Sequence, residues 1–478
     1  MPHVVTQSCC NDASCVHACP VNCIHPTPDE PDFGTAEMLY IDPAACVDCG
    51  ACVNACPVGA IKPAGALGDA QLPFLEINAD FYKDGRRRRT ILAPHEKPLQ
   101  VASRESLRVA IVGSGPSAMY AADELLTIPG ARVDVYERLT TPYGLARTGV
   151  APDHAETRRV TDVFDRISRQ DGFHLHLGVE IGKDVTHADL LRDHHAVLYA
   201  TGASSDRRLD VPGASGTATA TEFVAWYNGH PDHAHHEYDL SHPRAVIIGN
   251  GNVALDVARI LTSPPDSLAS TTISRTALEA LRTSAIEEVV VVGRRGPAHS
   301  AFTLAELVGL TAAADVVVPP ADLVGLDESS LKHRTIRALP SEPTAGRRVI
   351  LRYLLAPSEI TDTGVTFTRN ALDPETGRTV PTGETEHLKA GLILSSIGYR
   401  ARPLPDLPFD ADRAVVPNDR GRVLDATGEP VPGAYVTGWI KRGPTGFIGT
   451  NKTCARETVR ELVADYNTGR LKLPALAR

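Results

Sequence analysis

The fold of this chain is decided by residues 107–126, which read LRVAIVGSGPSAMYAADELL. An apolar run, a glycine turn and a second run with helical spacing follow one another, and this order predicts a buried strand, a tight turn and a helix. Gly113 makes the turn, Gly115 lets the backbone approach a pyrophosphate, and Ala118 permits close packing of the helix on the strand. Because the helix amino terminus then faces the phosphates, the stretch predicts a dinucleotide-binding βαβ unit.

A second unit of the same kind is predicted at residues 245–261, AVIIGNGNVALDVARIL. Its turn runs from Gly249 to Ala254 and has the same glycine spacing. Two such units predict an α/β architecture with two nucleotide sites.

The two sites are expected to take different nucleotides. Glu137 ends the next predicted strand, 22 residues past Gly115, where a carboxylate binds a ribose hydroxyl. A glutamate there disfavours a 2′-phosphate, so the first site suits FAD or NAD; the alternative is a surface glutamate that merely ends a strand.

The strand after the second unit ends in VVVVGRRGP, residues 289–297, which places Arg294 and Arg295 where an acid would stand. Two cations fit the 2′-phosphate of NADP through charge-assisted hydrogen bonds. The 43-residue gap from Gly251 to Arg294 is longer than usual, and an insertion at residues 262–287 accounts for it.

The cysteines indicate a metal-binding head. Nine of the ten lie between Cys9 and Cys56, and Cys454 stands apart. Clustered thiols in an intracellular protein indicate metal binding rather than disulfides. The run CVDCGACVNACP, residues 46–57, has the bacterial ferredoxin spacing C-x2-C-x2-C-x3-C-P, in which the fourth cysteine ligates the other cluster. Zinc is the alternative, but zinc sites favour two separated ligand pairs.

The opening stretch repeats this spacing as C-x2-D-x2-C-x3-C-P from Cys9 to Pro20, with Asp12 in place of the second cysteine. We therefore expect Cys46, Cys49, Cys52 and the crossing Cys19 to hold one [4Fe–4S] cluster.

The other cluster then takes Cys9, Cys15 and the crossing Cys56, with Asp12 at the fourth corner. Three thiolates suit a [3Fe–4S] cluster, which we favour. An Asp-ligated [4Fe–4S] cluster is the alternative, although oxygen is the harder donor. Cys10 and Cys23 fall outside the repeat and are expected to be structural or free. The head resembles the seven-iron bacterial ferredoxins.

Composition narrows the class of protein further. The chain has 478 residues, 42% of them hydrophobic, and a formal net charge of −10, which disfavours nucleic acid as a partner. No run is long and apolar enough for a membrane span, and the start does not resemble a signal peptide. We expect a cytoplasmic protein with no nucleic-acid partner and no membrane span. Residues 83–105, with four consecutive arginines, read as a linker.

Four long motifs carry a resemblance to a known family. They are residues 142–154 (PYGLARTGVAPDH), 249–261 (GNGNVALDVARIL), 293–307 (GRRGPAHSAFTLAEL) and 438–452 (GWIKRGPTGFIGTNK). In these motifs the chain resembles the adrenodoxin-reductase-like ferredoxin–NADP reductases, and with its head it resembles a ferredoxin/ferredoxin–NADP reductase fusion.

The resemblance implies an α+β ferredoxin-type head followed by an α/β flavoprotein with two Rossmann-like domains, of the glutathione/adrenodoxin reductase type. The expected domains are the iron–sulfur head (1–82), an FAD domain built from two segments (106–206 and 389–478), and an NADP domain between them (207–388). The implied FAD contacts are Ala118, Glu137, Leu145, Ile181, Trp439, Gly446, Phe447 and Ile448. The implied NADP contacts are Arg207, Asn250, Gly251, Asn252, Val253, Arg294, Arg295, Glu306 and Gly446.

His154 and Asp256 lie in motifs that line the flavin and nicotinamide region of the family, and we take them as the catalytic candidates. Some relatives have an acidic partner for this histidine three places after the Glu306 equivalent. Gly309 stands there in this chain and supplies no carboxylate.

The implied activity is transfer of a hydride from NADPH to FAD, followed by one-electron transfer to the clusters and to ferredoxin or another one-electron acceptor protein. No protein nucleophile is required. One alternative is an electron-input subunit similar to the glutamate synthase small subunit. Another is a non-enzymatic iron–sulfur scaffold, against which the two intact glycine turns and the paired arginines argue.

Overall fold

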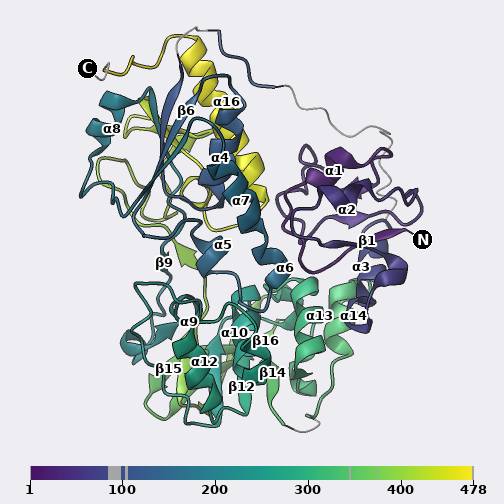
Figure 1. The fold of residues 1–478 in the computed structure, drawn as a ribbon. Helices are drawn as coiled ribbons and strands as arrows, with labels where there is room; N and C mark the ends of the chain where they lie inside the picture. The colour runs from purple at the N-terminus through teal and green to yellow at the C-terminus, as the bar shows by residue number, and fades with distance from the viewer. Residues whose placement is uncertain (1, 84–97, 103–105, 344–345, 374, 476–478) are drawn as a thin grey trace.

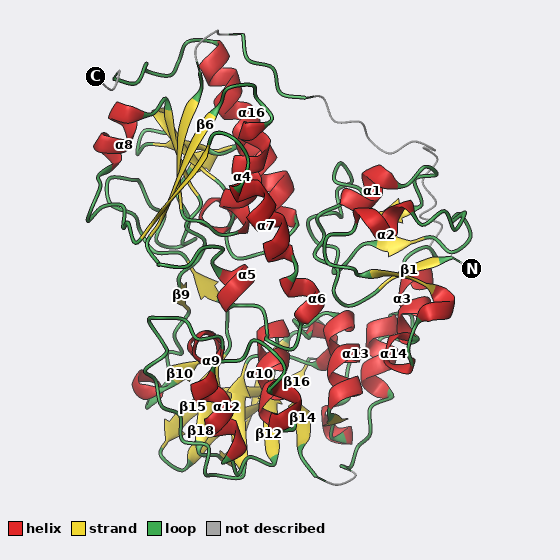
Figure 2. Ribbon diagram, viewed as in Figure 1, coloured by secondary structure: helices red, strands yellow, loops and turns green. Residues whose placement is uncertain are grey.

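A computed structural model gives the fold of residues 2–83, 98–102, 106–343, 346–373 and 375–475. Most of the predicted linker, 83–105, lies outside these described residues. Figure 1 shows a small amino-terminal head beside two larger α/β domains, and Figure 2 shows the strands of those domains flanked by helices. The fold class predicted from the sequence is confirmed.

The head, residues 2–83, is built from two short antiparallel strand pairs and three helices. Strand β1 (His3–Val5) pairs with β4 (Ile61–Pro63), and β2 (Ile24–His25) pairs with β3 (Tyr40–Ile41). The helices are α1 (Ser14–Ala18), α2 (Ala51–Ala55) and α3 (Pro73–Asp80), with 3-10 turns η1 (Ala64–Ala66) and η2 (Asp69–Gln71). So few short elements leave loops to carry most of the head.

The first large domain has a seven-stranded sheet in the order β20-β21-β22-β8-β5-β6-β7, parallel from β22 to β7. Its strands are β5 (Arg108–Val112), β6 (Arg132–Glu137), β7 (Phe173–Leu177), β8 (Ala196–Tyr199), β20 (Asn418–Asp419), β21 (Arg422–Leu424) and β22 (Pro430–Val436). Its helices are α4 (Pro116–Leu126), α5 (Leu145–Thr148), α6 (Ala155–Arg158), α7 (Val160–Ser168), α8 (His187–Asp193), α15 (Trp439–Arg442) and α16 (Thr450–Asn467). Helices α4, α7 and α16 pack together beside the sheet (Figure 1).

The second large domain has a six-stranded parallel sheet in the order β10-β18-β11-β12-β14-β13. These strands are β10 (Ala218–Thr219), β11 (Arg244–Ile248), β12 (Glu288–Val292), β13 (Asp315–Val317), β14 (Arg348–Arg352) and β18 (Leu392–Ser395). A meander of β15 (Leu355–Thr361), β16 (Gly364–Leu372) and β17 (Thr379–Lys389) packs on one face of the sheet.

Helices cover the other face of this second sheet. They are α9 (Ala220–Tyr227), α10 (Asn252–Thr262), α11 (Pro265–Leu268), α12 (Arg275–Arg282), α13 (Leu304–Ala313) and α14 (Leu331–Arg337), with 3-10 turns η3 (Ala214–Gly216), η4 (Pro297–His299) and η5 (Pro320–Asp322). The insertion predicted at 262–287 contains α11 and α12, and Ala277 and Leu281 anchor it in the core.

Two short strands join the large domains where the chain crosses between them. Strand β9 (Ser205–Asp206) pairs antiparallel with β19 (Tyr399–Arg400). The sequence predicted that the second FAD-domain segment starts at residue 389. This boundary is too early, because β18 pairs with β10 and β11 inside the second sheet. The chain therefore returns to the first domain only after Ser395. No helix in the described part of the chain is long and apolar enough to cross a membrane.

Candidate functional site

The first glycine turn leaves an open cradle at the start of α4. Gly113 has a φ of 95°, and a Cβ there would lie 2.7 Å from the Ala200 carbonyl oxygen, so both the turn and close packing require glycine. Gly115 differs, because its φ of −70° suits any residue and a Cβ would meet no protein atom within 4 Å. The space in front of Gly115 lies at a helix amino terminus and fits a phosphate group.

Glu137 ends β6 beside this cradle. Its carboxylate accepts hydrogen bonds from the Ser114 amide at 3.1 Å, the Ser114 hydroxyl at 2.7 Å and the Leu139 amide at 2.9 Å. These bonds fix the carboxylate at the edge of the turn, which is the position a ribose-binding acid needs.

The other residues expected at this site come from several elements. Ala118 is buried in α4, Leu145 begins α5, and Gly446, with a φ of 81°, precedes Phe447. Ile181 and Trp439 pack against one hydrophobic cluster of the domain, whereas Ile448 packs against the other.

The second glycine turn repeats the first. Gly249 has a φ of 119°, and a Cβ there would lie 2.0 Å from the Ser396 carbonyl oxygen. Gly251 has a φ of −89° and a Cβ there would meet no protein atom within 4 Å, so this cradle is also open. Asn252 accepts a hydrogen bond from the Thr303 amide at 2.8 Å, which ties the cradle to α13. Asn250 accepts one from the Phe302 amide, and Val253 packs against the core of the domain.

Arg294 and Arg295 follow β12 directly, and both side chains are exposed. Arg207 is exposed next to β9. Within the described ranges, none of these three guanidinium groups forms an ion pair with a carboxylate. Arg294 and Arg295 directly follow Gly293, where a Cβ would lie 2.6 Å from Asn250 Nδ2 of the second cradle. Two exposed cations at this place suit a polyanionic ligand.

A compact charge cluster lies between the two large domains. His154 Nε2 is 3.7 Å from Asp256 Oδ1 and 3.8 Å from Glu306 Oε2. Arg259 Nη2 lies 2.7 Å from Asp256, and Arg259 Nε lies 2.6 Å from Asp153. These side chains come from the start of α6, from α10 and from α13, so this set bridges the two domains.

The surroundings shift the pKa values of two carboxyl groups of this cluster in opposite directions. Burial, together with the nearby Asp256 carboxylate, raises the pKa of Glu306. Burial opposes ionisation of Asp153 as well, but hydrogen bonds from Arg259 hold the pKa of Asp153 below its usual value. Although His154, Asp256 and Glu306 have the spacing of a metal site, the Arg259 guanidinium already supplies the positive charge.

Sequence reasoning did not identify Arg259 as part of this cluster. The signal was present, because Arg259 stands three residues after Asp256 on a helix and therefore shares its face. Gln7 was missed too: its Nε2 donates to Glu306 Oε2 at 2.8 Å across 299 residues of sequence, which no local pattern reveals.

The head repeats its backbone conformation at both cysteine runs. Left-handed φ values occur at Asn11 (60°) and Ala13 (60°), and at equal offsets in the second run at Asp48 (58°) and Gly50 (74°). Each run then forms a five-residue helix that ends at the fourth cysteine position. The match supports alignment of Asp12 with Cys49.

One group of thiols lines a small pocket within the head. The pocket is lined by Cys19, Cys46, Cys49 and Cys52, together with Cys23. The first four are the set expected for a [4Fe–4S] cluster. Cys23, which the repeat does not include, lies with its Sγ 3.4 Å from Cys19 Sγ.

The second group comprises Cys9, Cys15 and Cys56 around Asp12. Burial is the main cause that raises the pKa of Cys9 to about 12, and the charges of Cys56 and Asp12 contribute to the rise. Burial also raises the pKa of Cys15, with Cys9, Asp12 and Cys56 as its charged neighbours. Burial thus disfavours ionisation of these thiols, and only a cation at the site would hold them as thiolates. This donor set therefore fits an iron–sulfur cluster.

Comparisons with known proteins agree with this geometry. A family model described as pyridine nucleotide-disulphide oxidoreductase matches residues 107–295, and one described as 4Fe-4S binding domain matches residues 39–62. A probable ferredoxin/ferredoxin–NADP reductase of Mycobacterium tuberculosis is 58% identical over 502 residues, which cover 99% of this chain and 85% of that protein.

Two further relatives lack so complete a match. Human mitochondrial NADPH:adrenodoxin oxidoreductase is 40% identical over 76% of this chain and 80% of its own length. The solved structure of Mycobacterium tuberculosis FprA in complex with NADPH has a TM-score of 0.72 and 42% identity, covering 77% of this chain and 87% of that one.

Proposed function

This chain belongs to the ferredoxin/ferredoxin–NADP reductase family, and from that membership we propose how its residues carry electrons from NADPH to an acceptor protein. The family predicted from the sequence is confirmed. The protein is an NADPH-dependent flavoprotein oxidoreductase with ferredoxin–NADP reductase activity and an iron–sulfur cluster. We propose ferredoxin or another one-electron acceptor protein as its partner.

FAD is held in the first cradle and NADPH in the second under this proposal. The observation that carries the assignment is the pair of open glycines, Gly115 and Gly251, each at the amino terminus of a helix where neither φ nor protein packing requires glycine. Glu137 would hold the ribose of FAD, and Arg294 and Arg295 the 2′-phosphate of NADPH. Bound FAD supplies the conversion of one two-electron transfer into two one-electron transfers.

The charge cluster positions the two nucleotides with respect to each other. Asp153 and His154 belong to the first domain. They form ion pairs with residues of the second domain, which are Asp256, Arg259 and Glu306. His154 and Asp256 would line the space between nicotinamide and flavin. Because burial and the nearby Asp256 carboxylate raise the pKa of Glu306, this carboxyl holds a proton more readily than an exposed glutamate does.

We propose that the second cluster is of the [3Fe–4S] type. Asp12 Oδ1 accepts a hydrogen bond from the Ser14 amide at 3.3 Å, and Asp12 Oδ2 accepts one from the Ser14 hydroxyl. Both carboxylate oxygens are thereby engaged at the start of α1. These local bonds from Ser14 to a side chain two residues before it support an aspartate that does not ligate iron.

Anaerobically purified protein tests the proposal directly. We expect FAD to be released on denaturation, and NADPH to be oxidised far faster than NADH, with cluster reduction following. A chain that releases no flavin, or that oxidises both nucleotides equally, would contradict it. We infer a cytoplasmic location from the clustered cysteines at iron–sulfur ligand spacing, which are typical of reducing compartments.

A further inference from the structure

The head is fixed against the first large domain. The Gly449 amide donates a hydrogen bond to the Cys10 carbonyl at 2.6 Å, and Lys452 Nζ donates to Ser14 Oγ at 3.3 Å. Both donors stand where α16 begins, immediately after the segment that we assign to FAD. Figure 1 shows the head beside the helices of this domain and above α13 and α14 of the other.

The head also contacts the second large domain. The Leu304 amide at the start of α13 donates to Glu37 Oε2 at 2.7 Å, and Lys332 Nζ lies 3.3 Å from Glu37 Oε1. Arg334 on α14 pairs with Glu76 at 3.2 Å. The head therefore bonds to both domains at once.

Gly449 is explained by this contact. Its φ of −74° and ψ of −25° suit any residue, so its own backbone conformation does not require glycine. A Cβ on Gly449 would lie 2.1 Å from the Asp12 amide nitrogen and 2.3 Å from the Asn11 carbonyl carbon. Because these are backbone atoms, they have no flexible side chain to move aside, and the docked head is what excludes a side chain here.

Gly309 gives a second, softer contact of the same kind. It lies inside α13, where glycine is the poorest residue after proline. A Cβ there would lie 2.2 Å from Gln7 Nε2, and Gln7 reaches over Gly309 to Glu306. The position that carries an acid in some relatives is thus left bare for a side chain of the head.

The docked head turns one thiol group inward and the other outward. Cys9, Cys10 and Cys56 pack into the same hydrophobic cluster as Ile448 of the FAD-binding segment. The pocket of Cys19, Cys46, Cys49 and Cys52 is lined only by residues of the head. At its rim Cys49 is exposed, and Val47 is 59% exposed.

We propose that the docked head is the fixed electron outlet of this enzyme. The cluster of Cys9, Cys15 and Cys56 is the inner relay next to the flavin. The cluster of Cys19, Cys46, Cys49 and Cys52 is the outer one, and the acceptor protein receives electrons at the Val47–Cys49 rim rather than from the flavin.

This inference rests on the proposed function, because it assumes electrons that enter from NADPH. Each NADPH oxidised to NADP⁺ supplies two electrons, and its hydride leaves one proton to solvent once both electrons have gone. The two electrons pass the inner and the outer cluster one at a time and reduce two acceptor molecules by one electron each. Electron count and charge therefore balance without a further reactant.

Relaxation of the electron paramagnetic resonance signals by a dysprosium chelate tests the order of the clusters in the full-length holoprotein. Each signal is assigned by its loss in Cys15→Ser or in Cys49→Ser. We expect the chelate in solution to speed relaxation of the signal lost in Cys49→Ser and to leave the signal lost in Cys15→Ser unchanged. Equal effects on both signals, or the reverse order, would overturn the proposal.

Glycine variants test the docking itself. In Gly449→Ala and in Gly309→Leu, the added side chain should displace the head from the large domains. The chelate should then speed relaxation of the signal that is lost in Cys15→Ser. Gly216→Ala is the matched control, because Gly216 has an ordinary φ and a Cβ there meets nothing within 4 Å. Retained protection in both glycine variants would overturn the docking, and Gly309→Leu keeps the test decisive where Gly449→Ala yields no folded protein.

This readout separates the inference from the proposed function. The signals are recorded on protein oxidised by air or reduced with dithionite, so neither NADPH nor FAD turnover is needed. Protein that shows the expected protection but no NADPH oxidation would refute the function and leave the docking standing.

Discussion

Arg294 and Arg295 are the residues on which selection of NADPH depends under our proposal. Each guanidinium is exposed and could form a charge-assisted hydrogen bond worth about 1.5–3 kcal/mol with a 2′-phosphate. Arg294→Ala and Arg295→Ala should therefore each lower kcat/KM for NADPH by about tenfold or more. The value for NADH, which lacks the phosphate, is the internal control and should not change. An unaltered NADPH-to-NADH ratio would move the phosphate site elsewhere.

Asp12 decides the iron content of the inner cluster. Asp12→Cys completes the second C-x2-C-x2-C-x3-C run and should raise the iron content by one atom per chain, with loss of the three-iron resonance signal. Asp12→Asn is the control, since it retains an oxygen to accept from the Ser14 amide but offers no thiolate. If Asp12→Asn instead loses an iron, the aspartate is a ligand.

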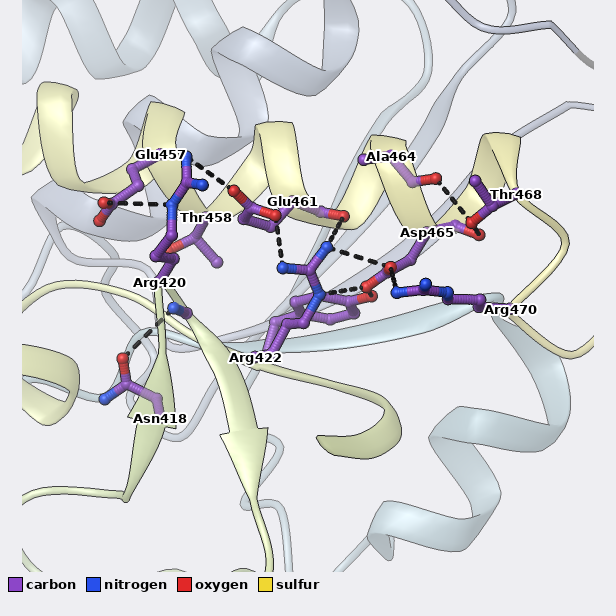
Figure 3. Close-up of polar contacts among 12 residues, drawn as sticks. Asn418, Arg420, Arg422, Glu457, Thr458, Glu461, Ala464, Asp465, Thr468 and Arg470 are labelled. Carbon is purple, nitrogen blue, oxygen red and sulfur yellow. Dashed lines mark hydrogen bonds and ion pairs between the residues drawn. The ribbon is translucent and has the colours of Figure 1, made fainter. Parts of the chain in front are cut away.

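At the scale of elements, helix α16 is locked to the strand hairpin β20–β21 by buried charge. Arg422 Nε lies 2.6 Å from Asp465 Oδ2, and the Arg422 guanidinium also pairs with Glu461 (Figure 3). Tyr435 donates a further hydrogen bond to Asp465 at 2.8 Å. Because α16 begins at the residue after Gly449, this network sets where the head and the FAD-binding segment meet.

Removing the arginine should therefore destabilise the first domain. Arg422→Gln removes the main cation of the buried Asp465 and leaves it only the exposed Arg470, 3.3 Å away. We expect a cost of about 3 kcal/mol, read as a fall in melting temperature. Arg420→Gln is the matched control: Arg420 also pairs with Glu461, at 2.8 Å, but is 62% exposed, so its loss should cost less than about 1 kcal/mol. Equal losses in the two variants would refute the role of burial.

The same pair predicts a pH dependence. Burial alone would raise the pKa of Asp465, but Arg422 and Tyr435 hold it below the ordinary value. A carboxyl group whose folded pKa is depressed stabilises the fold above its unfolded pKa, about 4, and loses that contribution as the pH falls through the folded value. The difference in melting temperature between wild type and Arg422→Gln should be full at pH 7 and should shrink below about pH 4. A difference that stays constant with pH would contradict this.

Elements with a local signature could be predicted, and elements defined by distant pairing could not. The strand, glycine turn and helix at 107–126 appear as β5, Gly113–Gly115 and α4, because each depends on residues close in sequence. Strand β18 was assigned to the wrong domain, since only its pairing with β10 and β11 shows where it belongs. The second turn was predicted, but its ties to Thr303 and Phe302 were not.

At the scale of the whole molecule, the sequence predicted an iron–sulfur head and a two-domain reductase, but not the contact between them. The cysteine spacing identified the head. Nothing in that spacing indicates that Gln7 packs against Gly309 or that the Asp12 backbone packs against Gly449. The place of Arg259 in the interdomain charge cluster could be predicted in part, because its helical spacing from Asp256 is visible in the sequence.

A double-mutant cycle measures the contact between the halves. Gly309→Ala in a Gln7→Ala background should stabilise the protein by about 1 kcal/mol, because alanine replaces glycine inside a helix. In the presence of Gln7 the same change should gain less, since the new methyl group displaces the Gln7 side chain. Thermal melting of the four proteins gives the coupling energy, and a coupling of zero would mean that the two residues do not touch.

The hydrogen bond from Gly449 to Cys10 has a consequence for kinetics. A reductase that releases its electrons to a free ferredoxin slows on dilution, because each transfer waits for a collision. Here the donor and the first relay are held in one molecule at a fixed separation, so filling the head is a first-order event. The rate at which NADPH reduces the clusters, per enzyme molecule, should be the same in a dilute extract as in a crowded cell, and only the final hand-over should depend on how much acceptor is present.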